Sequence, residues 1–193
     1  SLFYQHYAMS GAGTLIALVA MLLLLLPLDA RRRLALLAVL PVAWVPVWQA
    51  QAWQARLVVL DVGQGTSVVF QAAGRTLVYD TGGGDPAGRT VADSVLLPFL
   101  RRAGVERVDT LVVSHGDNDH SAGVATLARA FPIEETISGE TLAMPLPARR
   151  CRSGRAWTWG GGIDFQMLAG GGHTGNDSSC VLQVSVRGWR FLL

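Results

Sequence analysis

A short segment in the middle of the chain, residues 108–123, constrains the fold most strongly, because an apolar strand runs directly into a cluster of metal-ligand side chains. Three consecutive apolar residues, 111–113, predict the strand. A single His or Asp in a loop is usually only solvated, but two carboxylates this close repel each other unless a cation lies nearby. The spacing therefore predicts a metal site, formed by His115, Asp117, Asp119 and His120.

The order of these four residues resembles the signature of the metallo-β-lactamase superfamily, which is usually His-x-His-x-Asp-His. Asp117 stands here where that signature has its second histidine. This variant is similar to the C-terminal domain of the ComEC-type DNA-internalisation competence proteins, which are polytopic membrane proteins. The resemblance implies an α/β fold, namely a metallo-β-lactamase-like αββα sandwich, and a metal-dependent hydrolase.

Two glycine-rich strand ends add to the resemblance. Leu-Asp-Val-Gly-Gln-Gly at 60–65 resembles the family's first motif, although Thr66 departs from the acidic or small residue often found there. The resemblance implies that Asp61 supports the metal site from outside the ligand shell. Asp80, in Asp-Thr-Gly, resembles the superfamily's second motif and is expected to face the site. A role confined to a local turn is the alternative for Asp80.

The resemblance also implies how the four residues share the chemistry. His115 and Asp117 are expected to bind one of two divalent ions, and Asp119 and His120 the other. Metal-bound water then hydrolyses a phosphodiester, with catalysis depending on His115 and Asp119. Asp119 is further expected to orient or deprotonate that water. Because Asp117 replaces a nitrogen ligand by oxygen, we expect Mn to be favoured over Zn.

Further ligands are expected later in the chain. His173, in Gly-His-Thr-Gly, is a candidate distal metal ligand, and a polar residue in a glycine-rich loop is the alternative. The polar residues 176–179 are candidates for lining the site. The superfamily's bridging aspartate is expected after Leu193. The chain is therefore expected to be a fragment, with the sandwich and the site incomplete at the C-terminus.

Periodicity predicts the remaining elements. We expect a helix at 91–103, kinked by Pro98 and ended by Gly104, and another helix after the metal-ligand cluster. We expect short strands at 56–62, 66–71, 76–79, 133–137, 163–168, 179–186 and 189–193. The stretch up to Arg155 that follows the fourth of these strands has no clear pattern. Composition alone supports only a mixture of α and β structure.

Apolar residues make up 50% of the sequence and concentrate in its first third. Residues 8–28 and about 34–50 predict two transmembrane helices within a membrane segment, 1–53, ahead of the domain at 54–193. A signal peptide, or a single span followed by a surface-lying segment, is the alternative. The arginines at 31–33 predict a cytoplasmic turn between the two spans. The domain is then expected on the external or periplasmic side of the inner (cell) membrane.

A basic and aromatic stretch is a candidate DNA-binding surface, formed by Arg149, Arg150, Arg152, Arg155, Trp157 and Trp159. Arginines contact phosphates, and aromatic rings stack on unpaired bases. A solvated hairpin with buried tryptophans is the alternative. The net charge of +2 is too small to argue for nucleic acid by itself. Cys151 and Cys180 permit a disulfide, but we expect two buried free thiols.

The resemblance, with which the membrane segment agrees, implies part of a membrane DNA-uptake protein of natural transformation, whose domain hydrolyses the incoming non-transforming strand. The expected partners are DNA, the lipid bilayer, the remaining transmembrane channel of the same protein and other competence proteins. Two other functions stay open. One is a non-catalytic DNA-binding or gating module of the uptake channel, and the other is a metallohydrolase of another substrate.

Overall fold

The computed structural model describes residues 55–141, 144–169 and 175–193, together with Val19, Met21, Leu23 and Asp29. The two predicted transmembrane segments lie almost wholly outside the described residues, and so does His173. In the described part of the chain, no helix is both long and apolar enough to span a membrane. The chain divides into two compact units, and every strand and helix named below belongs to the second, Gln49–Leu193.

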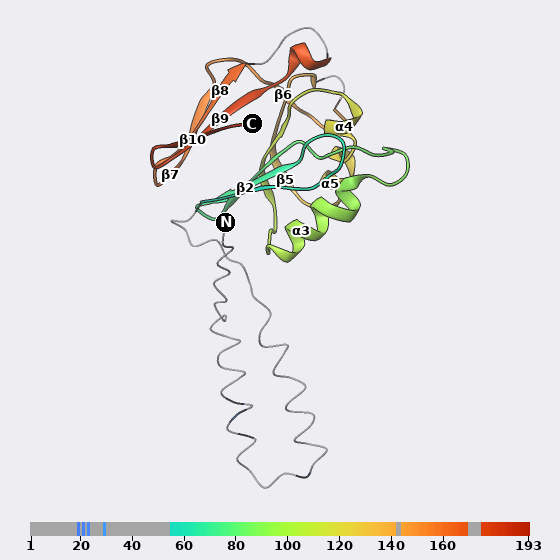
Figure 1. The fold of residues 1–193 in the computed structure, drawn as a ribbon, viewed down its shortest axis with the longest axis vertical. Coiled ribbons are helices and arrows are strands. Elements are labelled where there is room, and N and C mark those ends of the chain that lie inside the picture. Colours follow the sequence, from blue (N-terminus) through green and yellow to red (C-terminus); the bar gives the residue numbers. More distant parts are fainter. Residues whose placement is uncertain are drawn as a thin grey trace. The chain divides into compact units, whose positions relative to one another are not determined.

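Two β-sheets form the centre of this unit (Figure 1). The first has six strands in sequence order: β1 (Ala55–Val59), β2 (Val68–Ala72), β3 (Arg75–Tyr79), β4 (Val108–Val113), β5 (Ile133–Ser138) and β6 (Arg149–Arg150). Strands β1 to β3 pair antiparallel and β3 to β6 pair parallel. The second sheet is antiparallel, in the order β10 (Trp189–Leu192), β9 (Val181–Val186), β8 (Ile163–Ala169) and β7 (Ala156–Gly160).

Helices cover the outer face of the six-stranded sheet (Figure 1). The described helices are η1 (Ala92–Leu96), α3 (Leu97–Arg102), α4 (Asn118–Ser121), α5 (Val124–Ala130) and the 3₁₀ turn η3 (Gly175–Ser178). Two of them, α4 and α5, directly follow β4. The predicted strand, metal-ligand cluster and helix are therefore consecutive elements of one β–α unit.

The predicted helix at 91–103 differs from expectation at its start, where η1 is a π-helical turn. The N–H of Leu97 bonds to the carbonyl of Ala92, five residues back. Pro98 has no N–H and its ring excludes the carbonyl four residues back, so the wider turn lets the chain continue without that bond. Gly104 follows the helix with a φ of +70°, which confirms the predicted stop.

Two hydrophobic cores hold three layers together. The core between the sheets includes Phe70, Phe165 and Met167, and inward-facing residues alternate with exposed ones along β8. The core between the six-stranded sheet and the helices includes Leu100 and Leu111. Among the described residues, the order of layers is helices, sheet, sheet. These are three of the four layers of the predicted αββα sandwich.

Strand β7 was not predicted, because its arginine-rich approach and its glycine end look like a loop in the sequence. It pairs with β8 in an antiparallel hairpin. Trp157 stacks on Phe165 with 4.9 Å between ring centroids, and Trp159 meets the same ring at 4.7 Å. Both tryptophans pack against the core between the sheets. This is the packing that the hairpin alternative predicts for them.

Cys151 and Cys180 form a disulfide, so the expectation of two free thiols is wrong. Both residues are fully buried. The N–H of Cys151 bonds to the carbonyl of Ser138 at the end of β5, and the N–H of Cys180 bonds to the carbonyl of Ser114 just after β4. Because β4 and β5 are neighbouring strands, these bonds bring the two sulfurs together. The 29-residue spacing alone does not reveal that proximity.

Candidate metal centre

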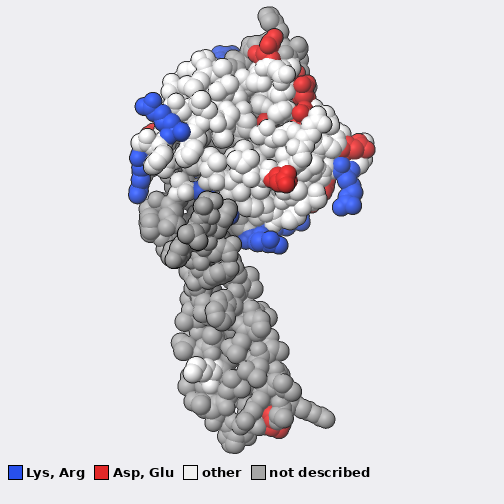
Figure 2. Space-filling model, in the orientation of Figure 1, with Lys and Arg blue, Asp and Glu red and all other residues white. Residues whose placement is uncertain are grey.

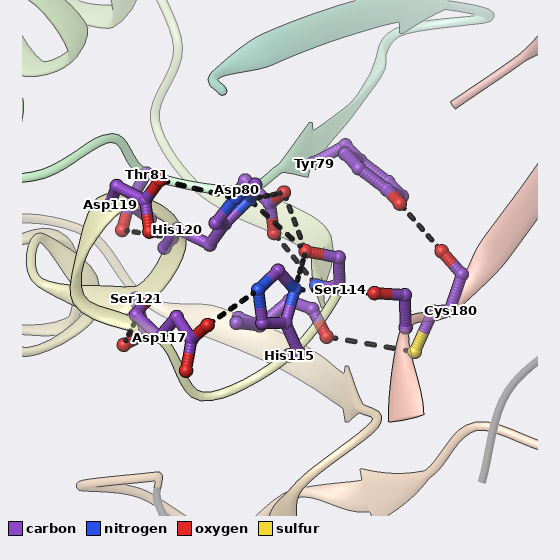
Figure 3. A network of polar contacts seen from close by, with 12 residues as sticks. Tyr79, Asp80, Thr81, Ser114, His115, Asp117, Asp119, His120, Ser121 and Cys180 are labelled. Atoms are coloured by element: carbon purple, nitrogen blue, oxygen red, sulfur yellow. Dashed lines mark hydrogen bonds and ion pairs between the residues drawn. The ribbon is translucent and has the colours of Figure 1, made fainter. Parts of the chain in front are cut away.

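The candidate metal ligands gather where the parallel strands β3 and β4 end (Figure 3). Asp80 follows β3, and His115 comes two residues after the end of β4. The N–H of Asp80 donates to the carbonyl of Val112 at 2.8 Å, which ties the two strand ends together. Asp119 and His120 lie in the short helix α4, which returns them to the same edge of the sheet.

Asp80 is at the centre of the polar network in Figure 3. Its side chain is 1% exposed. Oδ1 accepts the N–H of Ser114 at 2.7 Å, and Oδ2 accepts the Ser114 hydroxyl at 2.8 Å. Oδ2 also lies 2.7 Å from Nδ1 of His120. The φ of Asp80 is +58°, a left-handed conformation that aspartate adopts more readily than most residues. A role confined to a local turn would not explain hydrogen bonds to Ser114 and His120, which are 34 and 40 residues away in the sequence.

The hydrogen bonds favour one tautomer for each histidine ring. A carboxylate only accepts, so Nδ1 of His120 donates to Asp80. The single hydroxyl proton of Ser114 also goes to Asp80, which leaves its oxygen to accept from Nδ1 of His115 at 3.0 Å. Ser179 Oγ lies 3.3 Å from the same nitrogen. With both Nδ1 atoms protonated, the lone pairs of both Nε2 atoms are left for a ligand.

Each Nε2 atom faces one carboxylate. His115 Nε2 lies 3.3 Å from Oδ2 of Asp117, and His120 Nε2 lies 3.6 Å from Oδ2 of Asp119. Two donors on one tetrahedral metal, each bonded at about 2.0–2.1 Å, stand about 3.3 Å apart, so both pairs suit a divalent cation in chemistry and spacing. Among the described residues, however, no three His, Cys, Asp or Glu side chains are grouped so that they could hold an ion. Each pair thus offers two protein donors.

The carboxylates around His120 favour its protonated form. The hydrogen bond to Asp80 raises the pKa of His120 above its ordinary value, and partial burial opposes that rise. The negative charges of Asp80, Asp119 and Asp117 raise it further. A cation that binds Nε2 requires the neutral ring, so protons and metal compete at this position.

Backbone contacts fix α4 against the loops after β1 and β3. Thr81 donates both its N–H, at 2.9 Å, and its hydroxyl, at 3.0 Å, to the carbonyl of His120. The N–H of Thr66 bonds to the carbonyl of Asp119 at 3.4 Å. Gly65 lies so close to that carbonyl that a Cβ would collide with it, and its φ of +98° also favours glycine. The first glycine-rich motif therefore helps to set the position of Asp119.

A hollow of about 260 Å³ opens beside Asp119, lined by Val62, Gln64, Gly83, Gly84, Val91, Asn118 and Asp119. Asn118 Nδ2 donates to the carbonyl of Gly84 at 2.8 Å, which closes one wall of the hollow. In the view of Figure 2, acidic side chains gather on the side of the domain where α4 lies. A phosphodiester approaching this side meets negative charge, so its binding there requires bound cations.

Several predicted site residues are not brought to this cluster. Asp61 is exposed, and its Oδ1 accepts the N–H of Gly63 at 3.4 Å. Within the described ranges, no contact links Asp61 to the cluster, so the expected supporting role has no contact behind it. Arg149 and Arg150 lie on β6, Trp157 and Trp159 on β7, and Arg152 and Arg155 in the turn between these strands, so the six candidate DNA-binding residues are not part of the cluster. Of the polar stretch at 176–179, Ser179 reaches His115.

Two residues at the site were missed by sequence reasoning. Ser114 is buried and connects Asp80 to both histidines. A polar residue that ends an apolar strand directly before a candidate ligand was the available signal. Glu140 accepts hydrogen bonds from the N–H of Gly175 and the hydroxyl of Ser178, and so anchors the turn that leads to Ser179. Nothing near Glu140 in the sequence indicates this role.

Residues 60–192 match the Metallo-beta-lactamase superfamily, and the chain belongs to that superfamily. A solved metallo-beta-lactamase of Cronobacter sakazakii, a mutant in its HARLDQ motif, superposes on the chain with a TM-score of 0.53. The two are 18% identical, and the superposition covers 76% of this chain and 63% of the other. At that identity the likeness concerns the fold alone.

The predicted resemblance to competence proteins is confirmed by a relative that carries that name. Competence protein ComA of Neisseria gonorrhoeae is 36% identical over 186 residues, which are 92% of this chain and 25% of ComA. Recombination protein 2 of Haemophilus influenzae is 33% identical over 151 residues, which are 72% of this chain and 17% of that protein. The chain thus spans a quarter or less of the length of these relatives.

Proposed function

We propose that this domain is a metal-dependent phosphodiesterase that hydrolyses DNA, and that it acts in DNA uptake. The observation that carries the proposal is the pairing of each histidine Nε2 with one carboxylate, side by side at the ends of β3 and β4. Competence protein ComA, which aligns with 92% of the chain, supports the uptake role. Because the chain spans only 25% of that relative, the role of the whole protein is part of the proposal.

The donor set supports a site for two divalent ions. His115 and Asp117 would hold one, and His120 and Asp119 the other, with His173 as a candidate further ligand outside the described residues. The mixture of imidazole and carboxylate donors suits Mn as well as Zn, and the oxygen donor at Asp117 favours Mn.

Residues of the chain would orient the water and the metal ligands. Divalent ions, when bound, polarise phosphoryl oxygens and make water acidic near neutral pH. Asp119, which lines the 260 Å³ hollow, orients the attacking water and accepts its proton. Asp80 and Ser114 hold protons on both Nδ1 atoms and so keep Nε2 of His115 and His120 facing the ions. The mechanism requires no Ser or Cys nucleophile.

The proposed setting is the external face of the inner (cell) membrane. Two transmembrane helices within residues 1–53 would anchor the domain at 54–193 to the bilayer, next to the remaining channel of the same protein and other competence proteins. The disulfide between Cys151 and Cys180 supports an external location, because disulfides form and persist in oxidising compartments.

A non-catalytic gating module is the second candidate, favoured by one observation: the described residues include no group of three metal ligands. Substrate comparison separates the candidates. The full chain, supplied with Mn, is tested on end-labelled DNA, a chromogenic β-lactam and a chromogenic thioester. The proposal predicts cleavage of DNA alone, lost in His115→Ala and kept in Asp164→Ala, an exposed carboxylate on β8. Turnover of the β-lactam or thioester without DNA cleavage would replace the proposed substrate, and DNA binding without any turnover would favour gating.

A further inference from the structure

We infer that arginines on β6 and the turn after it form a binding site for the backbone phosphates of a DNA strand, separate from the candidate metal centre. The identification of the strand as DNA rests on the proposed function. The site is a hollow of about 470 Å³, whose described lining consists of arginines alone: Arg149, Arg150, Arg152 and Arg155. A guanidinium group presents a planar set of donors that matches phosphate oxygens in pairs.

The charge balance of the hollow favours an anion. Glu135 Oε1 lies 2.6 Å from Nη2 of Arg155 and 3.5 Å from Nη1 of Arg149. These two ion pairs share one carboxylate, so Arg149 and Arg155 together carry one positive charge more than Glu135 neutralises. An adjoining cleft of about 620 Å³ is lined by Arg75 and the same two arginines, but its carboxylates Asp109, Glu134 and Glu135 offset their charge. The carboxylates there disfavour a phosphate, which confines the inferred site to the arginine hollow.

The neighbouring tryptophans do not take part as base-stacking platforms. The ring of Trp157 lies nearly parallel to that of Phe165, at 7°, with Cζ of Arg155 5.8 Å from its centroid. Trp159 packs against both Phe70 and Phe165. Because these rings contribute to the core between the sheets, recognition falls to the arginines. Binding should therefore depend on salt and not on base sequence.

The backbone of Arg150 lies near the strand ends that carry the candidate metal centre, whereas Arg149 and Arg155 reach back to Glu135, near the start of β5. Arg150 on β6 pairs with Ser138 on β5, and Ser138 pairs with Val113 on β4, just ahead of His115. Two steps between neighbouring strands correspond to about 10 Å. The disulfide adds a direct link from Cys151, next to Arg150, to the segment that carries Ser179.

Salt-dependent DNA binding by the full chain tests the inference. Binding of a fluorescein-labelled oligodeoxythymidine of about 20 nucleotides is followed by anisotropy, in EDTA, so that neither metal nor cleavage is required. Each phosphate contact to a single strand contributes about 0.7 to the slope of log K against log salt. The double variant Arg149→Ala/Arg152→Ala should lose about 1.4 of that slope, and about 25-fold in affinity at 0.1 M salt. Glu135→Gln should bind more tightly than wild type.

Two controls make the outcome specific. Arg101→Ala/Arg102→Ala removes the same charge from α3 and should leave the slope unchanged. Hydrolysis of bis(p-nitrophenyl) phosphate, too small to reach the hollow, should be equal in wild type and in Arg149→Ala/Arg152→Ala when both are supplied with Mn. Equal slopes and affinities in the two double variants would overturn the inference while leaving the proposed hydrolysis standing. Arginine-dependent DNA binding without any hydrolysis would support the inferred binding site and contradict the proposed hydrolysis.

A membrane surface is the competing occupant, since lipid headgroups also carry phosphate. Vesicles containing phosphatidylglycerol should compete weakly with the oligonucleotide. Vesicle binding that is lost in Arg149→Ala/Arg152→Ala, together with absent DNA binding, would contradict the inference in favour of a lipid surface. Circular dichroism and thermal unfolding establish that both double variants fold.

Discussion

Replacing Asp80 by asparagine tests the control of the histidine tautomer in the candidate metal centre. Oδ1 of Asp80 accepts the backbone N–H of Ser114 at 2.7 Å, so the amide oxygen of an asparagine has to occupy that position. The NH₂ group then replaces Oδ2, which lies 2.7 Å from Nδ1 of His120. Because NH₂ only donates, Nδ1 must accept and the ring proton moves to Nε2. That proton blocks the nitrogen that faces Asp119.

The size of the effect follows from the two amide orientations. The opposite orientation would set the NH₂ group against the Ser114 N–H in a site where residue 80 is 1% exposed. Leaving a buried donor unpaired costs about 1–3 kcal/mol, which selects the first orientation by about 5- to 150-fold. Loss of such an orienting partner typically lowers metal affinity by about 10- to 100-fold. We expect a loss of that size for Mn or Zn.

Two measurements follow this change. At a pH above the raised pKa of His120, nitrogen-15 NMR of the histidine rings in the EDTA-treated chain should show His120 protonated at Nδ1 in wild type and at Nε2 in Asp80→Asn. Calorimetric titration should show the weaker metal binding. Ser114→Ala is the control for the His120 tautomer alone, because it removes one hydroxyl donor to Asp80 without adding a competing NH₂ group but also removes the acceptor of His115 Nδ1. An Nδ1-protonated His120 and an unchanged metal Kd in Asp80→Asn would refute the reasoning.

The same substitution has a signature in the pH dependence of stability. The folded-state pKa of His120 is raised, mainly by its hydrogen bond to Asp80. The stabilisation that this pair contributes is therefore fully present below the ordinary histidine pKa, about 6.5, and is lost as pH rises through the raised value. In EDTA, the difference in unfolding free energy between wild type and Asp80→Asn should shrink from pH 6 to pH 9. The difference is measured by urea unfolding. A difference that stays constant across this range would show that the Asp80–His120 pair contributes no pH-dependent unfolding free energy.

Two further changes, reduction of the disulfide and a glycine substitution, test the backbone that supports the site. Removing the Cys151–Cys180 disulfide by reduction should cost about 3–4 kcal/mol of unfolding free energy, from the entropy of a loop with a 29-residue separation. Urea unfolding with and without reductant measures this loss, and a Cys151→Ser/Cys180→Ser chain should not respond to reductant. Gly65→Ala should lower metal affinity and hydrolysis, because its Cβ collides with the carbonyl of Asp119. Gly63→Ala has a similar positive φ but open space around it, and equal losses in both variants would mean that backbone strain alone matters.

The candidate site was predictable in part because its ligands are close together in the sequence. His115, Asp117, Asp119 and His120 fall within six positions after one apolar strand, and their spacing alone places them at one strand end. What the sequence could not provide is the partner of each ring. The contact between Asp80 and His120 spans 40 residues and depends on the parallel pairing of β3 and β4.

In the fold, too, local sequence patterns predict the elements, but not the contacts between residues far apart in the sequence. Motifs and periodicity predict an α/β sandwich and most of its strands. The disulfide was mispredicted because the proximity of its cysteines depends on the pairing of β4 with β5, which no local pattern encodes. The tryptophans of β7 alternate as a strand should, but their packing on Phe165 requires the neighbouring strand β8. Asp61 shows the reverse case, since a motif resemblance placed it near the site and the fold leaves it exposed.

The central claim is that the two His–Asp pairs bind divalent ions that hydrolyse DNA, and metal-restored cleavage tests it most directly. The full chain is stripped with EDTA, titrated with Mn, and assayed on end-labelled single-stranded and double-stranded DNA. Bound Mn is measured on the same samples. The account predicts no cleavage without Mn, restored cleavage in wild type, and neither full Mn binding nor cleavage in His115→Ala and Asp119→Ala. Cleavage that persists in both variants, or wild-type chain that binds Mn and leaves DNA intact, would contradict it.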